Sequence, residues 1–237
     1  AETEITAMVT YLKEGMKFCM WHPDARPVLA LVDPELTLGL PPSLTAWTGV
    51  DAMVHAIEGY CVPGFNPLCD GSAIESLSLI SKSLYLAVEE PKNLVARGGM
   101  HVGSYLGGVA FLKGLGLVHA ISHMVGAEFN TQHGLTNAII LPVVLRYNLS
   151  GMDEKVKRMS EAMQFEDHSI EAFITNIEKM LDRLNIPKSL SEIGVPEDCV
   201  ERIAKKAMKD QAFATNPKIA TLEEVKEMTL ASIKKAR

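Results

Sequence analysis

Residues 49–60 read GVDAMVHAIEGY, and residues 114–134 read GLGLVHAISHMVGAEFNTQHG. Both stretches are unusually apolar around a few polar side chains, and their apolar positions recur at helical spacing. Small residues flank both stretches and allow helices to approach one another closely. The two stretches therefore predict buried helices at the centre of a helical fold.

Helical patterns continue on both sides of these stretches, from Pro41 to the end of the chain. Ser43 is the expected cap of the first helix, and Pro67 fits the first turn of the second. The predicted helices cover about 43–60, 67–90, 93–112, 117–128, 134–148, 152–163, 168–184, 197–208 and 222–236. The sequence thus predicts a mainly α protein, a multi-helix bundle over residues 41–237.

Residues 1–40 differ from the rest of the chain. Ile5–Tyr11 is rich in β-forming residues, Lys13–Gly15 fits a turn, and Pro27–Pro34 is a short apolar run typical of a buried strand. Two or three strands cannot close a sheet alone. We therefore interpret residues 1–40 as the β remnant of an N-terminal α/β domain that is otherwise missing. The start at Ala1, without an initiator Met, also indicates a fragment.

The composition excludes several classes of protein. A net charge of −6 without a basic cluster argues against nucleic-acid binding. The longest apolar stretches are too short to span a membrane, and no secretory signal opens the chain. The four cysteines show no CxxC pairing, so free thiols in a reducing cytoplasm are the simplest prediction.

Five polar side chains in the two central stretches carry the chemistry. Asp51 and His55 are four residues apart and share a helix face, as do His119 and His123. His133 follows a predicted loop. Judged alone, each pair fits an ion pair or a packed core histidine equally well. Their apolar surroundings favour a metal site of one carboxylate and three imidazoles, which suits Fe²⁺ or Zn²⁺ better than Mg²⁺ or Ca²⁺.

The motifs 49–60 and 114–148 (GLGLVHAISHMVGAEFNTQHGLTNAIILPVVLRYN) resemble the signature pair of the iron-containing alcohol dehydrogenases. The resemblance extends to Asp33–Leu36 with Leu40–Pro42, and to Asn216-Pro217 followed by Thr221–Glu224. Several long motifs in the right order make this similarity specific. It implies a dehydroquinate synthase-like α domain within a cytoplasmic homo-oligomer that interconverts small alcohols and aldehydes.

The resemblance also implies roles for individual residues. It places the metal ligands at Asp51, His55, His119 and His133, and it makes His123 the residue that relays a proton. Members of this family bind NAD(P) chiefly through an N-terminal domain whose glycine-rich loop is not found in this sequence. The remaining cofactor contacts that it implies are Thr6, Lys17, Thr37 and Leu44. We therefore expect this chain to be inactive alone.

Three alternatives stay open at this stage. The chain could belong to a zinc-dependent, glycerol dehydrogenase-like branch, although the presence of both His55 and His133 favours the iron type. It could instead be a helical metal-binding module without catalysis. A di-iron carboxylate bundle is the weakest alternative, because it needs paired E-x-x-H motifs and none occurs. For Glu58, one turn beyond His55, we slightly favour exposure to solvent over support of a ligand.

Overall fold

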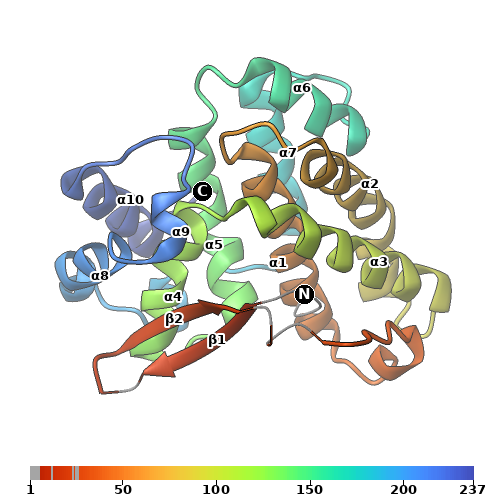
Figure 1. Ribbon diagram of the computed structural model, residues 1–237, viewed down its shortest axis with the longest axis horizontal. Helices are drawn as coiled ribbons and strands as arrows, with labels where there is room; N and C mark the ends of the chain where they lie inside the picture. Colours follow the sequence, from red (N-terminus) through yellow and green to blue (C-terminus); the bar gives the residue numbers. More distant parts are fainter. Residues whose placement is uncertain (1–5, 12, 23, 25–26) are drawn as a thin grey trace.

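Helix α1 (Pro42–Cys61) runs through the middle of the molecule and forms the centre of its core (Figure 1). It contacts α2 (Pro67–Glu89), α3 (Leu94–Ala110) and α5 (His133–Asn148). The computed structural model describes residues 6–11, 13–22, 24 and 27–237. Helix α1 is buried over most of its length because its apolar positions extend around nearly its whole circumference.

The other helices surround this centre, and the mainly α prediction is confirmed. Helix α4 (Leu117–Phe129) packs on α5, and α7 (Ile170–Arg183) packs on the far part of α5. The remaining α-helices are α6 (Asp153–Ala162), α8 (Val200–Ala207), α9 (Gln211–Ala214) and α10 (Leu222–Lys234). Short 3-10 turns occur at Pro34–Thr37, Phe111–Lys113, Ser191–Ile193 and Glu197–Cys199. The sequence did not predict α9, which has only one turn.

Side-chain caps explain where several helices begin. Asn66, Asn93, Ser169 and Thr221 each accept a hydrogen bond from a backbone N–H of the first turn, which is otherwise unpaired. The prediction that Ser43 caps α1 is wrong. Pro41 occupies the cap position, and Ser43 lies inside the first turn.

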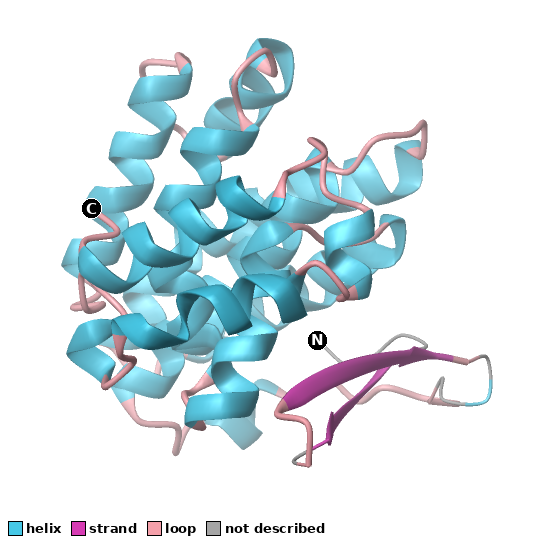
Figure 2. Cartoon of the chain, turned by 90° about the vertical axis from the view of Figure 1, so that its left-hand side faces the viewer, coloured by secondary structure: helices cyan, strands magenta, loops and turns pink. Residues whose placement is uncertain are grey.

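Strands β1 (Thr6–Tyr11) and β2 (Met16–Trp21) form an antiparallel hairpin that stands beside the helical body (Figure 2). Strand β2 contacts α4. Gly15 lies in the connecting turn with φ of 57°, a conformation that glycine adopts without strain. The predicted strand over Ile5–Tyr11 is therefore present from Thr6, and Ile5 lies outside the described residues.

The prediction of a buried strand over Pro27–Pro34 is wrong. This segment is irregular, and Val28, Leu29 and Leu31 are exposed by 105%, 71% and 80%. An apolar run becomes a buried strand only where a neighbouring strand pairs with it, and the described residues offer none beside this segment. The segment instead leaves a large apolar area uncovered.

Among the described residues, no single helix has the length and apolar character needed to cross a membrane. One pair, Leu94–Lys113 with Leu117–Phe129, meets these criteria only when joined, and it bends by 105° at the break.

Candidate metal centre

Three helices bring the predicted metal-ligating side chains together. Asp51 and His55 lie one turn apart on α1, His119 lies in the first turn of α4, and His133 is the first residue of α5. The two central motifs, far apart in sequence, thus meet in one place. One ligating atom from each residue lies within 4.8 Å of the corresponding atom of every other.

The tight turn between α4 and α5 places His133 at this site. Asn130 ends α4 in the left-handed conformation, with φ of 52°, and Gln132 caps α5 by accepting a hydrogen bond from Leu135 N at 2.6 Å. Gly134 lies so close to α1 that an added Cβ would be 2.4 Å from the carbonyl oxygen of Trp47. Glycine at this position allows α5 to start against the ligands of α1.

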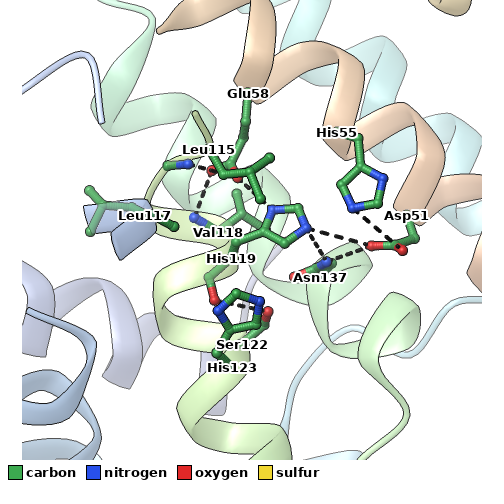
Figure 3. Close-up of polar contacts among 12 residues, drawn as sticks. Asp51, His55, Glu58, Leu115, Leu117, Val118, His119, Ser122, His123 and Asn137 are labelled. Atoms are coloured by element: carbon green, nitrogen blue, oxygen red, sulfur yellow. Dashed lines mark hydrogen bonds and ion pairs between the residues drawn. The ribbon is translucent and has the colours of Figure 1, made fainter. Parts of the chain in front are cut away.

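The ligand atoms surround Asp51. Its carboxylate oxygens lie 3.8 Å from His55 Nε2 and 3.8 Å from His119 Nε2 (Figure 3). They lie 3.6 Å from His133 Nε2. The rings of His55 and His119 are stacked with centroids 4.8 Å apart. These nitrogens and oxygens therefore point into one small volume.

The position of Asn137 indicates that the oxygen and nitrogen atoms of this site suit a cation. Its amide nitrogen lies 2.6 Å from Asp51 Oδ1, 3.1 Å from His119 Nε2 and 3.1 Å from His133 Nε2. The group that donates hydrogen bonds thus lies where three lone pairs converge. A divalent ion needs the same convergence of lone pairs, and three imidazoles with one carboxylate are ligands typical of Fe²⁺ or Zn²⁺.

Glu58 is buried, so our preference for a solvent-exposed Glu58 was wrong. It is 5% exposed, and one of its oxygens lies 2.7 Å from His119 Nδ1. The carboxylate also accepts hydrogen bonds from the backbone N–H groups of Gly116 and Val118. Helix α1 is buried on this side because the start of α4 packs against it. Burial raises the pKa of Glu58 to about 8, although the backbone N–H groups of Val118 and Gly116 oppose this rise. In its ionised form this carboxylate orients the imidazole through Nδ1 and leaves Nε2 free to bind a metal.

Burial keeps the imidazoles of the site neutral. It lowers the pKa of His55 and lowers that of His119 well below its ordinary value. Burial also lowers the pKa of His133 to about 4, although Asp51 opposes this shift. For Asp51, burial opposes ionisation, but His55, His133 and the Asn137 hydrogen bond outweigh it and lower the pKa. A deprotonated carboxylate and neutral imidazoles are the forms that bind metals.

His123 lies beside the four residues but has a different partner. Its Nδ1 is 2.8 Å from Asp210 Oδ2, and its ring stacks on His133 with centroids 5.4 Å apart. Asp210 is held in turn by a hydrogen bond from Ala212 N at 2.8 Å. In the described part of the chain the Nε2 of His123 has no hydrogen-bond partner, and His123 lines a cavity of about 390 Å³. In the neutral ring Nδ1 carries the proton, so Nε2 presents a lone pair.

The four predicted cofactor contacts do not lie together. Lys17 on β2 is near the metal centre, because Asp51 and His133 interact electrostatically with it and burial lowers its pKa. Thr37 instead hydrogen-bonds with the Nε2 of His101, and Leu44 lies half-buried in the first turn of α1. Thr6 belongs to β1. Nucleotide binding by these residues stays a prediction.

Asn137 and Asp210 were not predicted from the sequence. Asn137 follows His133 by four residues on the same helix, so helical spacing was a signal that it shares the face of a ligand. Asp210 lies 87 residues from His123, and no local pattern links the two.

Comparisons with known proteins show what this chain is similar to. Residues 45–233 match the family described as Fe-containing alcohol dehydrogenase family, C-terminal. The chain is 34% identical over 235 residues to NAD-dependent methanol dehydrogenase of Bacillus methanolicus, covering 96% of this chain and 62% of that protein. It is 36% identical to lactaldehyde reductase of Escherichia coli, covering 96% of this chain and 61% of that protein.

A solved structure, that of a 1,3-propanediol oxidoreductase, superposes with a TM-score of 0.93 at 33% identity. The match covers 98% of this chain and 63% of that one. The alcohol dehydrogenase of Oenococcus oeni gives a TM-score of 0.92 at 30% identity, covering 98% and 62% of the two chains. The chain thus spans less than two thirds of the length of these relatives.

Proposed function

Because the chain belongs to the iron-containing alcohol dehydrogenase family, we propose that it provides the metal centre of an NAD(P)-linked alcohol dehydrogenase. The substrates named for its relatives, methanol, lactaldehyde and 1,3-propanediol, support a small alcohol or aldehyde as substrate. The observation that carries the proposal is the convergence of Asp51, His55, His119 and His133 on one point.

These four residues would hold one divalent ion, with Fe²⁺ as the first candidate and Zn²⁺ as the second. When bound, such an ion supplies Lewis acidity that favours ionisation of an alcohol or polarises an aldehyde carbonyl. Glu58 keeps His119 in the required tautomer, since it lies against Nδ1 and leaves Nε2 facing Asp51. Asn137 has to withdraw its amide from the ligands for an ion to enter.

The chain also supplies a group that can take up and return a proton. His123 presents a lone pair on Nε2, while Asp210 holds the opposite nitrogen. A histidine in this arrangement can accept the hydroxyl proton of an alcohol during oxidation, and in the reverse reaction it can donate a proton to the oxygen of an aldehyde whose carbon receives the hydride. We propose that the cavity beside His123 admits the substrate, and that the hydride is exchanged with a nicotinamide bound chiefly outside this chain.

Cobalt substitution tests this function without the nucleotide-binding part. The chain loaded with Co²⁺ should show a visible spectrum typical of mixed nitrogen and oxygen ligands, and adding a small alcohol should shift it. Asp51→Asn should abolish the spectrum. A bound cobalt ion whose spectrum no alcohol or aldehyde alters would favour a metal-binding module without catalysis.

The proposal includes inactivity of the chain alone. Metal-loaded chain should not oxidise NADH with an aldehyde. Fusion to the N-terminal part of lactaldehyde reductase from Escherichia coli should restore turnover. Turnover by the chain alone would contradict this part of the proposal, and an inactive fusion that still binds both metal and NADH would contradict the assigned reaction.

A further inference from the structure

A second cavity, of about 350 Å³, lies between the segment 31–40 and helices α1 and α3. Thr45, Thr48 and Ala52 line it from α1. None of the four candidate metal ligands, nor His123, is among the residues that line it. The cavity is thus separate from the candidate metal centre.

Arg97 lines this cavity and is only 2% exposed. Its Nη1 donates to Thr45 Oγ1 at 2.9 Å, and its Nε donates to the carbonyl of Pro91 at 3.2 Å. Its Nη2 is buried and has no hydrogen-bond partner among the residues that the structure describes. A buried polar group without a partner is unfavourable, and a buried charge is more so.

The guanidinium of Arg97 differs in its surroundings from the other arginines of the described chain. Among the described residues none forms an ion pair with Arg97, whereas other arginines such as Arg146, Arg183 and Arg202 each pair with an acidic side chain. Burial lowers the pKa of Arg97, in keeping with a cation that lacks a counterion. The side chain nevertheless stays protonated, because arginine is always charged in proteins.

His101 lines the same cavity, but its Nε2 is already hydrogen-bonded to Thr37. The hydroxyl of Thr37 donates its single proton to the carbonyl of Pro34 at 2.9 Å. Its contact with His101 Nε2 at 3.2 Å therefore requires that Nε2 donates. Apolar side chains, including Leu40 and Met100, complete the wall. The cavity combines a cation, hydrogen-bonding groups and an apolar surface.

We propose that this cavity binds an oxyanion, the carboxylate or phosphate group of a small organic molecule, through the guanidinium of Arg97. An arginine fork matches the oxygens of either group and would gain the partner that Nη2 lacks. The apolar body of the molecule would lie against Leu40 and Met100. This site does not depend on the proposed dehydrogenase function.

Nuclear magnetic resonance on the metal-free chain tests the proposal with two probes. Broadening of the ³¹P signal reports binding of inorganic phosphate, and saturation transfer reports binding of butyrate. We expect millimolar binding of at least one probe, and Arg97→Gln should weaken it at least tenfold. Arg146→Gln is the matched control: it removes a surface arginine that is paired with Glu178, and it should leave binding unchanged.

A further variant keeps the test decisive if Arg97→Gln fails to fold. Ser104→Leu fills the cavity without removing any bond of Arg97, so it should also weaken binding. Phosphate binding alone would assign a phosphate ligand, and butyrate binding alone would assign a carboxylate. Absence of binding by both probes, or equal binding by wild type and Ser104→Leu, would overturn the proposal.

Discussion

The carboxylate of Glu58 lies 2.7 Å from Nδ1 of His119, on the edge of the imidazole opposite to the nitrogen that faces Asp51. Two backbone N–H groups, of Gly116 and Val118, hold this carboxylate in place. In its ionised form Glu58 therefore fixes both the orientation and the tautomer of His119, although it does not face the metal centre itself.

Glu58→Gln should weaken metal binding while leaving the four ligands present. Gln cannot accept hydrogen bonds on both of its terminal atoms, so His119 would lose its fixed tautomer. We expect the affinity for Fe²⁺ or Zn²⁺ to fall roughly 10–100-fold, measured by competition with a chelator. Glu75→Gln changes an exposed carboxylate and should have no effect. Equal metal affinities of the Glu58→Gln and Glu75→Gln variants would show that Glu58 does not support metal binding.

Gly134→Ala should destabilise the protein and weaken metal binding together. The added Cβ would lie 2.4 Å from the carbonyl oxygen of Trp47 and 3.1 Å from the Cβ of Asp51, so α5 would have to move away from α1. Overpacking of this kind costs about 1–3 kcal/mol of unfolding free energy, measured by urea denaturation.

Gly71→Ala is the matched control for this change. Gly71 lies inside α2, and an added Cβ there would meet no atom within 4 Å. Alanine favours a helix over glycine by up to about 1 kcal/mol, so this variant should be neutral or more stable. A Gly134→Ala protein with unchanged stability and metal affinity would contradict the close approach of α5 to α1.

The metal-free protein should lose stability as the pH falls below about 6.5. The pKa values of His55 and His119 are lowered by burial, and that of His133 is lowered from 6.5 to about 4. The unfolded chain therefore binds protons first, and folding stability is lost between about pH 6.5 and 4. Glu58 acts in the opposite direction, since burial raises its pKa to about 8, but it is one group against three.

Urea denaturation midpoints at several pH values measure how steeply the folding stability falls with decreasing pH. His133→Gln removes one imidazole that takes up a proton on unfolding, so its stability should fall less steeply in acid than that of the wild type. The same slope in both proteins would show that His133 is not buried as a neutral imidazole.

The buried thiols should resist alkylation until the protein unfolds. Cys61, Cys69 and Cys199 are free and buried. Burial raises the pKa of Cys61 to about 12, and it also raises those of Cys69 and Cys199. Since the thiolate is the reactive form, iodoacetamide should label these residues in urea but not under native conditions. Rapid native labelling of Cys61, located by mass spectrometry of peptides, would contradict the packing of α1.

The helices could be predicted from the sequence where periodicity and caps agree, as for α2, which starts at Pro67 after the cap Asn66. The meeting of Asp51 with His133 was expected from their apolar surroundings and from the resemblance, but not from helical spacing, because that relates residues within a helix and not between helices. The roles of Asp210 and Arg97 could not be predicted from the sequence. Their roles depend on contacts across the fold, with His123 and with Thr45, that no local pattern encodes.

The prediction of a buried strand over Pro27–Pro34 is wrong for a related reason. Its apolar composition is typical of buried structure, but composition does not say what covers it. In the described part of the chain this segment lies exposed, with Val28 and Leu31 uncovered.

The most direct test is the metal content of the chain after anaerobic incubation with Fe²⁺ or Zn²⁺ and desalting, measured by inductively coupled plasma mass spectrometry. The account predicts about one ion per chain, lost in Asp51→Asn and His133→Ala but retained in His168→Ala, which changes a histidine outside the site. A wild-type chain that retains no metal, or an ion that persists in both ligand variants, would contradict it.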